Sequence, residues 1–209
     1  LFTVTVRVLT KKGGTHDECM ARLGELLGAI YDVLADGSYD GLPLVDWGGV
    51  EWNGHAIRLP RSGMEIDFGG IGKEYAADRA AAIAIAAGIA HGFVNLAGDV
   101  RVWGGRPEGA PWRVGIRHPR IEGETIGGIE IADGAIATSG DYERCFEVGG
   151  RRYCHILDAT TGWPVQGWRS VSVAAPLCVV AGSGATVGML LGDAAPDWLD
   201  AQGVDWLGV

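Results

Sequence analysis

The chain has 209 residues, 47% of them apolar, which is enough for one substantial hydrophobic core. Its formal net charge of −9 and the lack of a lysine or arginine cluster argue against nucleic acid as a partner. The four cysteines (Cys19, Cys145, Cys154, Cys178) lack C-x-x-C spacing and nearby paired histidines, which argues against a zinc site.

The first predicted elements lie within the first sixty residues. Apolar and polar side chains alternate over residues 2–8, which predicts a half-buried strand. A capping box at Thr15 and Glu18 begins a helix whose apolar residues recur at helical spacing as far as Leu34. Strands at 50–52 and 55–59 flank Asn53-Gly54, a pair typical of a hairpin turn.

A strand, a glycine-rich loop and a helix follow in succession. The strand is predicted at 64–68, the loop at 69–72 and an alanine-rich helix at 74–90. Glycines let the backbone approach a ligand closely, the helix start presents N–H groups to an anion, and Lys73 adds a positive charge. The alternative is a turn that carries glycine only for close packing. A Walker A motif is excluded because Glu74 follows the Gly-Lys pair.

Short strands separated by turn residues make up most of the remaining chain. They are predicted at 93–96, 100–103, 112–117, 126–131, 142–148, 151–157, 170–175 and 204–207, with a further helix at about 179–191. Gly149-Gly150 joins two strands as a hairpin, which places Cys145 opposite Cys154. That register allows a disulfide, and two reduced, packed thiols are the alternative. Antiparallel strands interrupted by two or three long helices predict the α+β class.

Residues 170–192 contain no charged side chain and therefore have the hydropathy of a membrane span. Pro176, several glycines and several hydroxyl side chains interrupt the stretch, so a buried strand, turn and helix are predicted instead of a transmembrane span. The first six residues lack the basic start and the apolar stretch of a signal peptide.

Three further segments carry more polar residues and glycine than a plain core uses: residues 95–99, 137–144 and 155–162. Each of them, taken singly, is typical of a turn in which Asn, Asp or Ser caps its own backbone. Within the second segment, Asp141 and Arg144 are expected to hold the root of the hairpin.

Taken in order, these segments resemble the ApbE-type FAD:protein FMN transferases over nearly the whole chain. The resemblance is carried by Asp46-Trp, the hairpin at 51–60, and residues 64–78 (MEIDFGGIGKEYAAD), 94–99 (VNLAGD), 116–120 (IRHPR), 136–144 (IATSGDYER), 153–158 (YCHILD) and 161–164 (TGWP). It implies a T-fold-related α+β architecture, with mostly antiparallel sheets, and a single domain over residues 1–209.

The resemblance also implies an activity. Family members cleave the pyrophosphate of FAD, release AMP and attach FMN through a phosphoester to a threonine of an acceptor flavoprotein subunit, using Mg²⁺. Such a reaction needs a cation on the pyrophosphate, a positioned hydroxyl and a phosphorus held in line with the leaving AMP. A flavin-binding protein without transferase activity and an FAD pyrophosphatase are the alternatives. The family suggests the bacterial periplasm or inner membrane as the compartment, with the cytoplasm as the alternative.

Site residues are implied by their positions in the family motifs. Asp67 and Lys73 are expected to contact FAD, and the backbone carbonyl of Gly70 is expected to ligate Mg²⁺ as a hard oxygen ligand. His155 is the candidate general base on the acceptor threonine because imidazole titrates near neutral pH, and a histidine that only hydrogen-bonds at a strand end is the alternative. Ile156 aligns with a position that touches the flavin through backbone and packing.

Two departures from the family pattern bear on the metal and on the pocket. The family segment resembling residues 181–186 begins Ala-Asp, and its aspartate binds the metal, whereas this chain has Gly182 there. Thr186 then remains as a hydroxyl ligand, and a neutral site holds Mg²⁺ more weakly than one with a carboxylate. Family members also carry a further N-terminal segment that contacts the cofactor. We therefore expect this chain, which starts without methionine, to be a fragment or processed form with a pocket open on one side.

Overall fold

The computed structural model describes residues 47–66, 68–158 and 161–209. These residues fall into two compact units, one of 68–158 with 163–209 and the other of 47–66 with 161–162. The strand predicted at 2–8, the helix predicted after Thr15 and the side chain of Asp67 lie outside the described residues. The expectation of a single domain over 1–209 stays a prediction.

The smaller unit contains a short hairpin. A 3₁₀ turn, η2 (Trp47–Gly49), precedes β1 (Glu51–Trp52) and β2 (Ile57–Arg58), which pair antiparallel. The side-chain oxygen of Asn53 accepts the amides of His55 at 3.0 Å and Ala56 at 2.8 Å. The hairpin is confirmed, but its loop has four residues instead of two because Asn53 caps the following amides. The strand predicted at 64–68 is wrong for the described residues 64–66 and 68.

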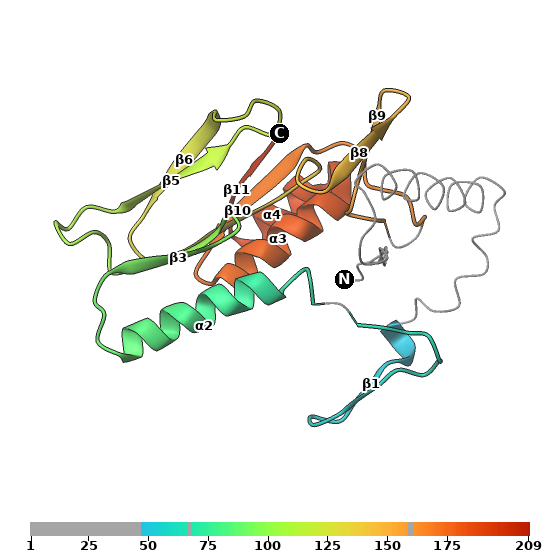
Figure 1. The fold of residues 1–209 in the computed structure, drawn as a ribbon, viewed down its shortest axis with the longest axis horizontal. Helices are drawn as coiled ribbons and strands as arrows, with labels where there is room; N and C mark the ends of the chain where they lie inside the picture. The colour runs from blue at the N-terminus through green and yellow to red at the C-terminus, as the bar shows by residue number, and fades with distance from the viewer. Residues whose placement is uncertain (1–46, 67, 159–160) are drawn as a thin grey trace, which may run out of the picture. The chain divides into compact units, whose positions relative to one another are not determined.

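The larger unit is built on a five-stranded sheet in which all neighbours are antiparallel (Figure 1). Its spatial order is β11 (Asp205–Gly208), β10 (Ser170–Ala175), β7 (Gly134–Gly140), β4 (Asp99–Trp103) and β3 (Gly92–Leu96). The α+β class with mostly antiparallel sheets is thus confirmed.

The central strand β7 was not predicted, because its second half is polar. The hydroxyls of Thr138 and Ser139 resemble turn residues in the sequence, but each finds a partner inside the unit. Thr138 Oγ1 lies 2.8 Å from Ser172 Oγ on β10, and Ser139 Oγ lies 2.9 Å from Thr186 Oγ1 on the helix Cys178–Leu191. Satisfied hydroxyls are compatible with a buried strand.

Two helices pack side by side on one face of the sheet (Figure 1). The first, α2 (Gly72–Ala86), lies along β3 and β4 and buries Ala77 and Ala81. The second, α3 (Cys178–Leu191), lies along β7 and β10 and buries small residues. A 3₁₀ turn, η3 (Gly192–Ala194), leads into α4 (Ala195–Gln202), a short helix that was not predicted.

A second hairpin, β5 (Trp112–Arg117) with β6 (Thr125–Ile131), covers the other face of β4. Val100 and Val102 point toward it, while the alternate residues of β4, Asp99 and Arg101, point toward the helices. Every residue of β4 is therefore buried. The side chains of Asp99 and Arg101 on the helix side therefore extend from a fully buried strand.

The hairpin β8 (Cys145–Val148) with β9 (Arg151–Cys154) has the predicted register, with Cys145 opposite Cys154. Gly149 and Gly150 have φ values of 59° and 77°, the left-handed region that a two-residue turn of this kind requires. Both thiols are free; Cys154 is packed in the core as the reduced alternative predicted, whereas Cys145 is exposed.

One helical stretch of the described chain, Cys178–Gln202, is long and apolar enough to cross a membrane by length and composition only. Gly192, with φ 55°, interrupts it between α3 and α4. Its small residues, such as Ala181 and Ala185, are fully buried inside the unit. These contacts are those of a core helix.

Candidate functional site

The glycine-rich segment forms a tight turn that leads into α2. The carbonyl of Phe68 accepts the amides of Ile71 at 3.0 Å and Gly72 at 2.7 Å. Gly70, the predicted carbonyl ligand, lies inside this turn and is half-buried. Among the described residues no side chain caps the start of α2, so its first turn presents backbone amides and the charge of Lys73.

Lys73 makes an ion pair that the sequence did not predict. Its Nζ lies 2.5 Å from Asp99 Oδ2, where the lysine side chain is 43% exposed and the aspartate side chain only 3%. Asp99 begins β4 directly after a two-residue turn, in which Ala97 and Gly98 have φ values of 53° and 97°. The turn expected at 95–99 is therefore confirmed, and in addition its last residue holds the lysine of the glycine loop in place.

Glu74, the next residue along α2, points inward. It is only 5% exposed, and its Oε2 has no hydrogen-bond partner in the described part of the chain. Burial raises the pKa of Glu74, and the negative charge of Asp99 adds to this, while its own backbone amide and Lys73 act in the opposite direction. Its side chain lies against Gly182 of α3, where an added Cβ would be 2.5 Å from Glu74 Cγ.

Thr186, the predicted hydroxyl ligand, is on α3 one turn after Gly182. Its Oγ1 is hydrogen-bonded to Ser139 Oγ of β7 at 2.9 Å. A hydroxyl has further lone pairs, so this bond does not prevent it from binding a cation. Among the described residues there is no group of three or more His, Cys, Asp or Glu side chains that could hold a metal.

His155 lies just after β9 and is fixed by the backbone of Arg144. The carbonyl of Arg144 accepts the His155 amide at 3.0 Å and lies 3.3 Å from the ring Nδ1. Because a carbonyl only accepts, Nδ1 carries the proton, and Nε2 keeps its lone pair. Partial burial of the ring lowers the pKa of His155, and the positive charges of Arg144 and Lys73 lower it further, against the raising effect of the Arg144 carbonyl.

Ile156, by contrast, points into the core. Its side chain is 8% exposed and packs in a cluster with Val171, Val173 and Met189. Its carbonyl accepts the amide of Val165 at 2.9 Å. The predicted contact of Ile156 with a flavin is not tested by this arrangement and stays a prediction.

Asp78 of α2 is hydrogen-bonded to the start of α3. One carboxylate oxygen accepts the amide of Cys178 at 2.8 Å and the other that of Val179 at 3.0 Å, so a side chain of α2 caps the start of α3. Arg101 of β4 lies 3.6 Å from the same carboxylate. Burial, followed by the charges of Asp99, Asp78 and Glu74, raises the pKa of Cys178 to about 12. This thiol is therefore not a nucleophile at neutral pH.

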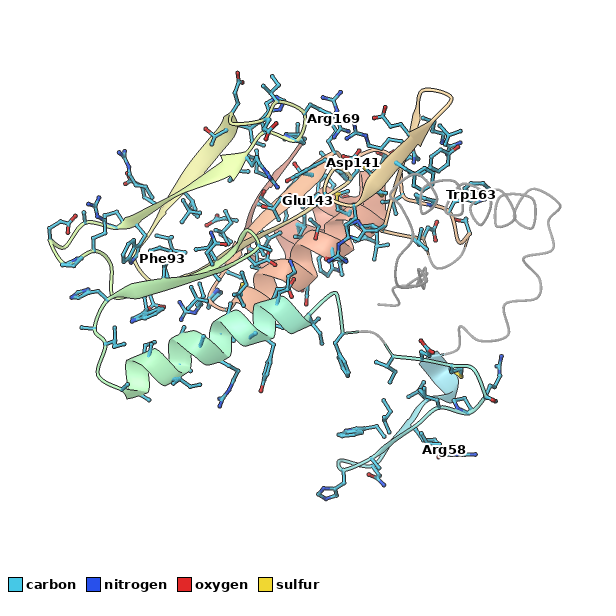
Figure 2. The ribbon with its side chains drawn as sticks, in the orientation of Figure 1. Arg58, Phe93, Asp141, Glu143, Trp163 and Arg169 are labelled. Atoms are coloured by element: carbon cyan, nitrogen blue, oxygen red, sulfur yellow. The ribbon has the colours of Figure 1, made fainter. Side chains whose placement is uncertain are left out.

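Asp141, which was predicted to be structural, forms a bidentate pair with Arg120 at 2.6 and 2.7 Å. It also lies beside Arg169, whose carbonyl accepts the Asp141 amide at 3.0 Å (Figure 2). With Arg152, these residues line a cavity of about 200 Å³. Lys73, Glu74 and Thr186 are not among its lining residues, so we assign the cavity no role in the site at the start of α2.

The site therefore consists of elements brought together at one end of α2. The charges of Lys73 and Asp99 both act on the pKa of Glu74, and the charge of Lys73 also lowers the pKa of His155. Sequence reasoning missed Glu74 and Asp99 as functional candidates. The signal for Asp99 was its place in a polar turn, and the signal for Glu74 was its place directly after the Gly-Lys pair.

The sequence profile of the ApbE family matches residues 2–207. An FAD:protein FMN transferase of Rhodobacter capsulatus is 37% identical over 146 residues, which is 69% of this chain and 27% of that protein. One from Vibrio cholerae serotype O1 is 38% identical over 132 residues, or 62% of this chain and 40% of that protein. The chain thus spans well under half of the length of these curated relatives.

Solved structures agree with the sequence matches. The ApbE protein from Thermotoga maritima has a TM-score of 0.72 at 37% identity, covering 81% of this chain and 57% of that one. The flavin transferase ApbE from Vibrio cholerae has a TM-score of 0.67 at 28% identity, covering 79% and 53%. The larger unit described above is therefore similar in fold to proteins of this kind.

Proposed function

Because this chain belongs to the ApbE family, we propose that it transfers FMN from FAD to a threonine hydroxyl of an acceptor protein and releases AMP. The observation that carries this proposal is the ion pair between the residue after the glycine turn and β4, in which Lys73 Nζ lies 2.5 Å from the buried Asp99. A lysine held at a helix start in this way is suited to binding a pyrophosphate. The 37% identical transferase of Rhodobacter capsulatus supports the same conclusion.

The proposed reaction is a displacement at the flavin-side phosphorus of FAD. A bond forms from the threonine Oγ to this phosphorus, and the bond from the phosphorus to the bridging oxygen breaks, so that AMP leaves with that oxygen. His155 takes the threonine proton on Nε2, because Nδ1 donates to the Arg144 carbonyl. Lys73 stabilises the negative charge that spreads over the phosphate oxygens.

A divalent cation such as Mg²⁺ would supply additional charge neutralisation on the pyrophosphate. The residues present fit such an ion, because the buried Glu74 Oε2 has no partner within the described ranges and Mg²⁺ prefers hard oxygen ligands. The carbonyl of Gly70 and the hydroxyl of Thr186 would hold it. In the position of the family's aspartate, Gly182 contributes no ligand.

The proposal is tested by incubating the protein with FAD, Mg²⁺ and an acceptor domain that carries one threonine. We expect in-gel flavin fluorescence on the acceptor and AMP in a one-to-one ratio, with neither label nor AMP when that threonine is replaced by valine. Release of AMP together with free FMN would identify an FAD pyrophosphatase instead. Tight FAD binding without AMP would identify a flavin-binding protein, and either result contradicts the proposal.

The role of His155 predicts the pH dependence of the reaction. The neutral imidazole is the base, and its pKa lies below the ordinary value of 6.5 because of partial burial and the neighbouring positive charges. The value of kcat/KM for AMP release should therefore fall toward low pH with a midpoint below pH 6.5 and reach its plateau at neutral and higher pH. Replacing Lys73 by methionine should move the midpoint up, toward 6.5.

A midpoint of the acid limb at or above pH 6.5 in the wild-type protein would contradict this role of His155. Arg113→Gln is the matched control for the lysine variant, because it also removes one positive charge, from an exposed pair with Glu130 on the β5–β6 hairpin. It should leave the midpoint unchanged, since exposed charges are screened by salt.

A further inference from the structure

One oxygen of the Glu74 carboxyl group is buried without a partner. The residue is 5% exposed, and Oε2 has no hydrogen-bond partner among the residues that the structure describes. Leaving a buried carboxylate oxygen unpaired is costly, and most such groups in proteins bind another polar group, an ordered water or an ion. Its position on α2 therefore calls for a positively charged or donating partner.

The nearest positive charge in this part of the structure is already paired. Lys73 Nζ lies 2.5 Å from Asp99 Oδ2, and Asp99 is the more deeply buried member of that pair. Asp99 itself adds negative charge beside Glu74. A hydrogen bond between the two carboxyl groups also raises the pKa of Glu74. When both groups are ionised, they carry more negative charge than one lysine neutralises, so a cation in addition to Lys73 favours that ionised form.

Glu74, in its present conformation, occupies the space that a side chain at residue 182 would need. A Cβ built on Gly182 would lie 2.5 Å from Glu74 Cγ and 2.8 Å from Oε1. The glutamate carboxylate thus reaches from α2 into the space that an aspartate on α3 would fill. The family pattern has its carboxylate on α3, so this chain has a carboxylate in the same region on the opposite helix.

The remaining ligands named for the metal lie on the same two segments. Gly70 is in the turn that begins α2, four residues before Glu74, and Thr186 is on α3, four residues after Gly182. Mg²⁺ in sites that bind a phosphate substrate usually has one or two carboxylates, neutral oxygens and substrate phosphates. Glu74 supplies the carboxylate that this donor set lacks.

We propose that Glu74 is a direct ligand of the divalent cation, in place of the carboxylate that Gly182 does not provide. The inference rests on the proposed function, because the cation is the one which that reaction uses. It corrects the expectation of a neutral metal site: the carboxylate is retained, on α2 instead of α3. Weak metal binding is accordingly not expected for this chain.

The test is a titration of the full chain with Mn²⁺, followed by electron paramagnetic resonance of the free ion, with and without FAD. Wild-type protein should bind one Mn²⁺, and Glu74→Gln, which keeps the shape but not the charge, should bind it about 10-fold or more weakly. A double variant, Glu74→Gly with Gly182→Asp, should restore binding to within a few-fold. Glu130→Gln, an exposed carboxylate of β6, is the control and should change nothing.

The inference is overturned if Glu74→Gln binds Mn²⁺ as tightly as the wild type, or if the wild type binds none in either condition. It is also overturned if the double variant melts as a folded protein and binds no better than Glu74→Gln. These results are separate from those for the activity. Binding that depends on Glu74 without FMN transfer contradicts the proposed function alone, whereas FMN transfer with Mn²⁺ binding unchanged in Glu74→Gln contradicts the inference alone.

Discussion

Replacing Gly104 by alanine is expected to lower the free energy of unfolding by about 3 kcal/mol or more. Gly104 directly follows β4 and has φ 67°, a left-handed conformation that costs a residue with a Cβ about 1 kcal/mol. The added Cβ would also lie 1.8 Å from the carbonyl oxygen of Ala90. Because that atom belongs to the backbone ahead of β3, the contact is relieved only by moving backbone next to the sheet, which no side-chain rotation can do.

Urea denaturation measures this effect, and Gly109→Ala is its control. Gly109 also has a left-handed φ, 84°, but a Cβ there meets nothing within 4 Å. It should therefore lose only the conformational part, about 1 kcal/mol. An equal loss in the two variants would show that the Ala90 carbonyl is not in the way. Because Gly104 directly follows the strand that Asp99 begins, we also expect slower AMP release from Gly104→Ala where it remains folded.

Replacing Lys73 by methionine is expected to slow AMP release about 100-fold or more, because a positive charge aimed at the pyrophosphate contributes mostly in the transition state. Asp99→Asn tests the same pair from its other side. It leaves the lysine charge in place but removes the ion pair that positions it at 2.5 Å. We therefore expect a smaller loss, about 10-fold, from Asp99→Asn.

Single-turnover measurements of AMP release, with thermal unfolding of each variant, separate these effects from stability. Loss of Lys73 leaves a buried carboxylate unpaired and should lower the free energy of unfolding by about 1–3 kcal/mol. Arg113→Met is the control, because it also removes one positive charge, from the exposed Arg113–Glu130 pair. It should change neither the rate of AMP release nor the free energy of unfolding appreciably. If Asp99→Asn slowed the reaction more than Lys73→Met, positioning by Asp99 would not explain its role.

Patterns of neighbouring residues predicted those parts of the fold that depend on residues close together in the chain. The strands β5 and β10 begin and end as predicted, since their apolar residues are flanked by turn residues. The Gly149-Gly150 turn fixed the register of Cys145 and Cys154. In each case the residues that determine the element are close together in the chain.

Features that depend on distant partners were missed. The polar half of β7 pairs with β10, and it can be buried there because Ser172 and Thr186 hydrogen-bond to its hydroxyls; neither residue is near it in the sequence. Glu74 was interpreted only as the residue that rules out a Walker A motif. Its assignment as a candidate metal ligand depends on Gly182, because the Glu74 side chain fills the space between α2 and α3 that a side chain at position 182 would need. A single sequence shows both residues but not that they meet.

The cap of α3 by Asp78 has a consequence for how the chain acquires its fold. The first amide of α3 takes its partner from a residue 100 positions earlier. At synthesis rates of roughly 5–20 residues per second, Asp78 is made about 5–20 s before Cys178. During this interval α2 can form, but the Asp78 carboxylate has no α3 amide from which to accept a hydrogen bond. The two-helix layer is therefore completed late, and a nascent chain stalled before Cys178 exposes the side of β7 and β10 that α3 covers in the folded protein.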